Sequence, residues 1–147
     1  LAITTPPEVT ERVIKTNLLG TIFVNQMLAP LLIKKNWGRI INFSTIAVSI
    51  GLKGESVYVA SKAGVEAFSR VFANEMSPFN ITVNCIAPGP VRTNLIKGIS
   101  EKQISNIVNH QIIKKEMSSI DIVKTVNLLL SQDACNITGQ VLHVGGV

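Results

Sequence analysis

The chain has 147 residues, which predicts one domain with a single hydrophobic core. Hydrophobic residues make up 46% and charged residues 16%, so the composition excludes a disordered chain and favours a subunit covered by partner chains. The net charge is +5, but the 14 basic residues are scattered, so we do not expect nucleic-acid binding. Cys85 and Cys135 form no Cys-x-x-Cys pair and are predicted to be reduced core thiols, with no metal site.

The first predicted element is a long helix over residues 7–35. Thr5 offers a capping hydroxyl, and prolines and Glu8 follow it in the first turn. Residues 16–33 are 18 consecutive positions without a charge, which approaches the length of a membrane span. Amides and a proline interrupt this stretch, and a spanning helix would have to satisfy those amides in hydrocarbon. We therefore expect no membrane span, but a helix buried between subunits.

The rest of the chain alternates strands and helices. Apolar, β-favouring runs predict strands over residues 39–45, 81–87 and 140–144, the first of them central in the sheet. Apolar residues at helical spacing predict a helix over 57–77, which Pro78 ends. Residues 93–110 are weakly helical, and Ser118 with Asp121 caps a last helix that ends near residue 130. This order predicts an α/β fold, a doubly wound parallel sheet in one partial domain over residues 1–147.

Tyr58 and Lys62 are the first candidates for chemistry. They lie four residues apart on one face of a predicted helix, just after the carboxyl end of a strand, where ligands bind to open parallel sheets. A nearby ammonium favours phenolate and lowers the pKa of the phenol toward neutrality, which suits proton transfer to a carbonyl oxygen. The alternative is a chance pair, with the phenol packed and the lysine in solvent.

Five ordered motifs carry a family resemblance. They are TNLLG at 16–20, GRIINFST at 38–45, YVASKAG at 58–64, ITVNCIAPGPVRT at 81–93 and ITGQVLHV at 137–144. With them the chain resembles the short-chain dehydrogenase/reductase family, most closely its 3-oxoacyl-carrier-protein-reductase-like members. The resemblance implies a Rossmann-type sheet, NAD or NADP as the cofactor, and hydride transfer between nicotinamide and a carbonyl or secondary alcohol. A small molecule or acyl thioester as substrate, a homotetramer or dimer and a cytoplasmic location follow from it as expectations.

The resemblance also implies residue roles. Tyr58 is the expected general acid in reduction, and Lys62 is expected to hold ribose hydroxyls and to lower the pKa of the phenol. Asn17 is expected to support a water that relays protons to Lys62, and the alternative is an amide that caps a helix irregularity. The catalytic hydroxyl falls on Thr45, thirteen residues before Tyr58, where the family usually has serine. We favour Thr45 over Ser44, because neighbouring side chains of a strand point to opposite faces.

The turn after the second predicted strand is the expected nicotinamide contact. Pro88 and Gly89 are expected to meet the carboxamide, with Gly89 letting the backbone approach, and Thr93 is expected to donate a hydrogen bond nearby. Residues 94–115 correspond to the family's substrate lid. Lys97 and Lys102 are candidates to attract an acidic carrier or phosphate, and a solvated helix face explains them as well.

A glycine-rich phosphate loop, on which dinucleotide binding in this fold depends, is not found in these 147 residues. The N-terminal cofactor-binding half is therefore expected to lie outside the chain. The chain begins with Leu1 and no signal peptide is visible, so we expect the carboxyl-terminal part of a longer enzyme. The alternative is a truncated, noncatalytic relative that retains oligomer-forming helices.

Overall fold

Three parallel strands form the sheet in a computed structural model that describes residues 1–93 and 98–147. The strands are β1 (Gly38–Phe43), β2 (Ile81–Pro88) and β3 (Val141–Val144), paired in the order β1-β2-β3. Gly38 lies opposite Ile81, and Cys85 lies opposite Val141. All three predicted strands are confirmed. The first ends two residues earlier than expected, because Thr45 has left the sheet to begin the next helix.

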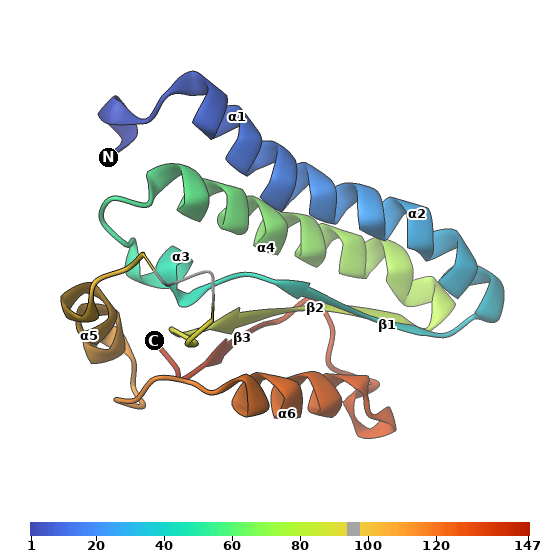
Figure 1. Cartoon of the computed structure of the whole chain (residues 1–147). Helices are drawn as coiled ribbons and strands as arrows, with labels where there is room; N and C mark the ends of the chain where they lie inside the picture. Colours follow the sequence, from blue (N-terminus) through green and yellow to red (C-terminus); the bar gives the residue numbers. More distant parts are fainter. Residues whose placement is uncertain (94–97) are drawn as a thin grey trace.

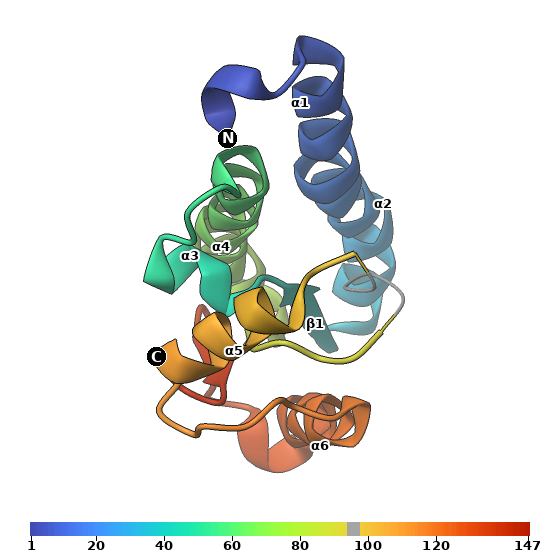
Figure 2. The same ribbon diagram turned by 60° about the vertical axis from the view of Figure 1, so that its left-hand side comes forward.

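Helices cover both faces of the sheet, as Figure 1 shows. One face carries α1 (Pro7–Ile14), α2 (Gly20–Lys35) and α4 (Ser56–Met76), and the other carries α6 (Ser119–Leu130). Near the carboxyl ends of the strands lie α3 (Ile46–Ile50) and α5 (Glu101–His110), which are seen from the side in Figure 2. The predicted α/β, doubly wound class is confirmed, and α3 lies between two predicted elements where the sequence analysis predicts none.

A π-helical turn, Lys15–Leu19, joins α1 and α2 into one long helix. Among the described residues, this helix, Pro7–Lys35, is the one that is long and apolar enough to cross a membrane by length and composition. It packs on α4 and β1, however, and the buried side chain of Asn25 donates a hydrogen bond to Asn42 Oδ1 in β1 at 3.0 Å. The predicted Thr5 cap is wrong, because its hydroxyl donates to the carbonyl of Leu1 and no side chain caps α1.

The core lies where α2 and α4 meet the sheet. Its central side chains are apolar, and the rings of Phe68 and Phe72 stack with centroids 5.2 Å apart. A buried polar chain runs beside them: the Asn42 amide donates to Ser69 Oγ at 2.8 Å, and the Cys85 thiol lies 3.2 Å from the same oxygen. These bonds satisfy polar groups that burial would otherwise destabilise, and they fix α4 on the sheet.

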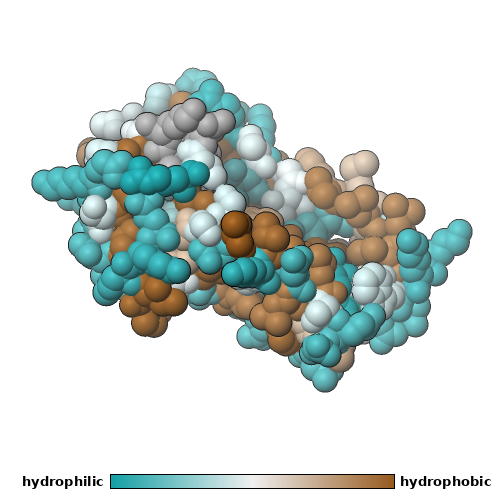
Figure 3. All heavy atoms as spheres, turned by 60° about the horizontal axis from the view of Figure 1, so that its bottom comes forward, coloured by the Kyte–Doolittle hydropathy of each residue, from teal (hydrophilic) through white to brown (hydrophobic). Residues whose placement is uncertain are grey.

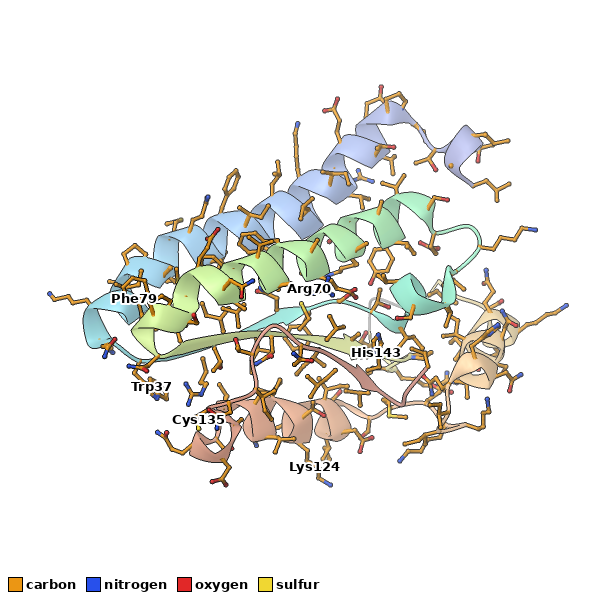
Figure 4. All side chains as sticks on the ribbon, turned by 180° about the vertical axis from the view of Figure 1, so that it is seen from behind. Trp37, Arg70, Phe79, Lys124, Cys135 and His143 are labelled. Carbon is orange, nitrogen blue, oxygen red and sulfur yellow. The ribbon has the colours of Figure 1, made fainter. Side chains whose placement is uncertain are left out.

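Two expectations differ from the structure. Among the described residues β1 is an edge strand that pairs with β2 alone, so the expected central position is not found within this chain. Cys85 is buried as expected, but Cys135 is exposed in the segment after α6, as Figure 4 shows. The polar residues Ser131, Gln132 and Asp133 before Cys135 are the sequence signal that distinguishes it from Cys85, which lies within a predicted strand.

Side chains cap the N-termini of the two helices α5 and α6. Ser118 and Asp121 form the predicted capping box of α6. Ser100 and Gln103 form a second capping box at the start of α5. The sequence analysis did not use this Ser-x-x-Gln motif, because the apolar periodicity of the segment is weak. The caps fix where each helix starts.

Candidate active site

The end of β1 separates two neighbouring hydroxyls. The Ser44 side chain is 5% exposed and donates a short hydrogen bond to the carboxyl of Glu66 on α4. Thr45 is the N-cap of α3, and its oxygen accepts a hydrogen bond from the Ala47 amide at 3.2 Å. The two side chains thus have different partners, although both residues follow β1 rather than belong to it.

Tyr58 and Lys62 lie in the first two turns of α4, beside the end of β1. The Thr45 side chain lies close to the phenol of Tyr58 and favours its ionised form. The Lys62 ammonium donates to the carbonyl of Phe43, the last residue of β1, with 3.0 Å between nitrogen and oxygen. Thr45, Tyr58 and Lys62 are therefore gathered at one place, which is the carboxyl end of a parallel strand.

Burial controls the ionisation of this pair. It raises the pKa of Tyr58, the hydrogen bond from Thr45 acts in the opposite direction, and the charge of Glu55 adds a smaller rise. Burial also lowers the pKa of Lys62, because a desolvated ammonium is less stable than the neutral amine. The lowered phenol pKa that the Tyr58–Lys62 spacing predicts is therefore not found in this arrangement. The reason is that desolvation of the phenol outweighs the hydrogen bond.

Asn17 lies in the π-helical turn between α1 and α2. Its side-chain amide donates to Ser61 Oγ at 3.1 Å, and the Ser61 hydroxyl in turn donates to the carbonyl of Tyr58 at 2.6 Å. Such π-turns are frequent at functional sites, because they change the direction of a side chain within a helix. Asn17 thus reaches the residue that precedes Lys62, and the sequence analysis missed Ser61.

The turn after β2 lies next to this cluster, because β2 pairs with β1 and the Ser44 amide donates to the carbonyl of Ile86 at 2.8 Å. Pro88 is the last residue of β2, and the Gly89 amide donates to the carbonyl of Val144 at 3.2 Å. The side of Gly89 that a side chain would occupy is filled by Gln111, another residue that the sequence analysis missed. Gly89 is therefore in close contact with the chain itself.

Thr93 and the expected lid follow this turn. Thr93 is exposed, Lys102 is exposed on α5, and Lys97 lies outside the described residues. The Arg92 guanidinium binds both carboxylate oxygens of Glu101 at 2.8 Å and also contacts Glu116 at 2.8 Å. It therefore joins the start of α5 to the segment before α6, and it lowers the pKa of Glu101.

The described residues hold no group of three His, Cys, Asp or Glu side chains that could bind a metal ion. His143 on β3, labelled in Figure 4, instead lies with Nε2 2.8 Å from Ser49 Oγ on α3. This contact joins the last strand to the helix that Thr45 begins. The chemistry that the geometry offers is accordingly that of hydroxyls and an ammonium.

Comparison with known proteins gives a consistent result. Residues 2–146 match the family described as enoyl-(acyl carrier protein) reductase. The chain is 36% identical over 134 residues to the 3-oxoacyl-(acyl-carrier-protein) reductase FabG of Haemophilus influenzae, covering 91% of this chain and 55% of the relative. It is 39% identical over 137 residues to the FabG of Aquifex aeolicus, covering 92% and 55%. Nodulation protein G of Rhizobium meliloti is 34% identical over 134 residues, with 91% and 55% covered.

The chain thus spans about half the length of the curated relatives it matches. The family match covers nearly the whole chain, and the parallel sheet with helices on both faces agrees with it. These findings place the chain in the short-chain dehydrogenase/reductase family of oxidoreductases, among its 3-oxoacyl-carrier-protein-reductase-like members.

Proposed function

We propose that the protein is a cytoplasmic NAD(P)-dependent oxidoreductase that reduces the keto group of a 3-oxoacyl thioester. The observation that carries the proposal is the placement of Thr45 beside Tyr58, with Lys62 one helical turn away, at the carboxyl end of β1. These residues bring a proton-donating hydroxyl and a second, orienting hydroxyl to one place, which is what a carbonyl oxygen requires. The FabG relatives bear the name of that substrate class.

The residues present fit a nicotinamide cofactor, NAD or NADP. The Lys62 ammonium has three donors and gives one to the Phe43 carbonyl, so two remain for the hydroxyls of the nicotinamide ribose. Tyr58 provides a further hydroxyl on the same side. Pro88, Gly89 and Thr93 follow the adjacent strand end and would hold the carboxamide. When bound there, the cofactor supplies the hydride for the carbonyl carbon.

The residues of this chain would handle the proton. Thr45 orients the carbonyl oxygen by a hydrogen bond, and the Tyr58 hydroxyl donates its proton to that oxygen as negative charge develops on it. With its two remaining donors on the ribose, the Lys62 ammonium would favour the phenolate of Tyr58 by its charge. Asn17, through Ser61, holds the first turns of α4 in place and supports the route by which a proton returns to Lys62.

The nucleotide half of the cofactor needs elements beyond this chain. Backbone amides of a glycine-rich loop hold the pyrophosphate in this fold. The free edge of β1 is where further parallel strands would add, because an unpaired edge leaves backbone donors and acceptors open. We infer that the complete protein adds its cofactor-binding half at this edge.

Large apolar side chains on α2 support a homo-oligomer. Five of them are at least half exposed, namely Phe23, Val24, Met27, Leu28 and Leu31. A second apolar area lies on the face that carries α6, where brown spheres gather in Figure 3 and where Ile120, Val123 and Leu128 are exposed. Contiguous apolar surface of this kind marks protein contacts. We therefore propose that α2 packs against its copy in a dimer or tetramer, together with α4, which lies beside α2 and exposes Val71.

A noncatalytic, oligomer-forming relative is the second candidate. Two observations favour it: threonine replaces the usual serine at position 45, and burial raises the pKa of Tyr58 in this structure. Both candidates share the same fold and the same apolar helices. They differ only in turnover.

The test is turnover by the full-length gene product. NADH or NADPH oxidation is followed at 340 nm with a 3-oxoacyl thioester and, separately, with the matching enoyl thioester. We expect oxidation with the 3-oxoacyl thioester alone, because Thr45 and Tyr58 are placed to orient and protonate a keto oxygen, whereas reduction of the enoyl double bond adds its proton to carbon. Turnover of the enoyl thioester alone would overturn the substrate class. Turnover of neither, in a folded protein that binds the cofactor, would favour the noncatalytic candidate.

A further inference from the structure

Gln111 is a fully buried amide with an unusual set of contacts. It follows α5 directly, and its Nε2 atom donates to the carbonyls of Ile113 at 2.9 Å and Lys115 at 2.7 Å. Its Oε1 atom is buried without a hydrogen-bond partner among the described residues. A buried acceptor without a partner destabilises the fold. The side chain therefore has a role that an apolar residue would not fulfil.

The Oε1 atom lies against the backbone of Gly89. A β-carbon added at Gly89 would be 1.7 Å from this oxygen and 2.8 Å from Gln111 Cδ, far inside van der Waals contact. The φ angle of Gly89 lies outside the left-handed region, so any residue could adopt its backbone conformation. Position 89 thus requires glycine because Gln111 occupies the space of the side chain.

The carboxyl-terminal turn meets the same amide. A β-carbon at Gly145 would lie 3.2 Å from Gln111 Cδ and Nε2. The Ile113 amide donates to the carbonyl of Gly145 at 2.8 Å, and the Gly89 amide donates to that of Val144 at 3.2 Å. Three segments distant in sequence therefore converge on one side chain: the turn after β2, the segment after α5 and the tail after β3.

We propose that Gln111 is a positioning residue that sets the place of the Pro88–Gly89 turn relative to the segment following α5. Its Nε2 atom fixes the amide plane by two hydrogen bonds, and the fixed plane holds Oε1 against Gly89. Without the Gln111 side-chain amide, the Pro88–Gly89 turn is no longer held in this position. The inference rests on the proposed function in one respect, which is that this turn contacts the nicotinamide; the packing itself does not depend on it.

A double-mutant cycle on thermal unfolding of the full-length gene product tests the packing. Gly89→Ala is expected to lower Tm by several degrees, because the new methyl group displaces Oε1 and breaks both Nε2 hydrogen bonds. In the Gln111→Ala background, Gly89→Ala is expected to lower Tm by at most one-third of that amount. Gly20→Ala is the control, since its β-carbon would be at an ordinary 3.6 Å from the Lys15 carbonyl oxygen. Equal effects of Gly89→Ala in both backgrounds would overturn the contact.

Should Gly89→Ala alone fail to fold, recovery of soluble protein in the double variant gives the same answer. Failure of the double variant as well, where Gln111→Ala alone folds, would contradict the proposal.

Cofactor binding and turnover test the positioning. Gln111→Met keeps the length of the side chain and removes both donors, and we expect the Kd and KM for the nicotinamide cofactor to rise about tenfold with kcat within twofold. A lowered Tm with unchanged cofactor Kd would show a structural role only and overturn the proposal. A gene product that binds cofactor and never turns over would contradict the proposed function, while the Kd of Gln111→Met and the unfolding cycle would still decide the role of Gln111.

Discussion

The Lys62 ammonium lies 3.0 Å from the carbonyl oxygen of Phe43, so α4 is attached by a charge-assisted hydrogen bond to the last residue of β1. Thr45 follows Phe43 by two residues, and Tyr58 precedes Lys62 by one helical turn. The contact therefore holds the start of α4 beside the end of β1, where Thr45 and Tyr58 lie.

Substitutions of the two hydroxyl residues at the end of β1, Thr45 and Ser44, are expected to have different effects on kcat and on stability. Thr45→Val removes the hydroxyl beside Tyr58 and keeps the shape of the side chain, so we expect kcat to fall about 10²- to 10³-fold, as for loss of one donor to a developing oxyanion. Thr45→Ser keeps the hydroxyl and is expected to retain turnover. Ser44→Ala removes the bond to Glu66 and is expected to reduce stability by about 1 kcal/mol with little change in kcat. A larger kcat loss for Ser44→Ala than for Thr45→Val would reassign the hydroxyl.

The ionisation of Tyr58 gives a spectroscopic prediction. Without cofactor, the phenol is expected to titrate above its ordinary pKa of 10.0, because burial disfavours phenolate. Thr45→Val should raise this pKa further, since the hydrogen bond that stabilises phenolate is lost. The measurement is the difference in absorbance titration near 295 nm between each protein and its Tyr58→Phe counterpart. A cofactor-free phenol that titrates below 10.0 would show that Lys62 acts on it directly.

The capping box of α6 makes stability depend on pH in the acid range. The amide and hydroxyl of Ser118 hold the pKa of Asp121 below its ordinary value of 3.8. The unfolded state therefore binds the proton more tightly, so the stabilisation is complete above that value and is lost as the pH falls through the lower, folded-state pKa. We expect Asp121→Asn to lower Tm at pH 7 and to have little effect near pH 2. Glu75→Gln, on an exposed carboxyl of α4, is the control, and an equal Tm change for both variants at pH 7 would contradict the role of the cap.

The apolar face of α2 predicts the assembly. Met27 is 76% exposed and Leu31 is 60% exposed on successive turns. The double change Met27→Lys and Leu31→Lys is expected to convert the oligomer to monomers in sedimentation velocity, because two ammonium groups would have to be buried in the contact. Lys53→Glu, a charge change in the loop before α4, is expected to leave the assembly intact. A monomeric unaltered protein would contradict the proposed contact.

Periodicity and turn chemistry were sufficient for most of the fold. The alternation of apolar strands with helices predicted the parallel sheet, and Ser118 with Asp121 predicted the start of α6. The missed helix α3 is only five residues long and has the composition of a strand continuation, so neither period is visible in it. The prediction that Thr5 caps α1 is wrong for a local reason. A 3-10 helical turn, Ala2–Thr4, precedes Thr5, and the Thr5 hydroxyl donates to the Leu1 carbonyl at the start of that turn.

The site was less accessible to sequence reasoning than the fold. Ser44 and Thr45 have different partners, as expected, but both lie beyond the strand that was expected to separate them, and the Lys62 ammonium contacts the Phe43 carbonyl rather than the Tyr58 phenol. The pKa of the phenol depends on how deeply the tertiary fold buries it, which spacing does not show. Gln111 lies 22 residues from Gly89, and no local pattern indicates that a buried amide requires a glycine at that distance.

The central claim, that Tyr58 is the proton donor, is tested most directly by Tyr58→Phe in the full-length gene product. The measurement is kcat for NAD(P)H-dependent reduction of a 3-oxoacyl thioester, with cofactor Kd and sedimentation recorded beside it. We predict that kcat falls about 10²- to 10⁴-fold, as for loss of a general acid, with unchanged assembly. Retention of kcat by the Tyr58→Phe variant would contradict the account.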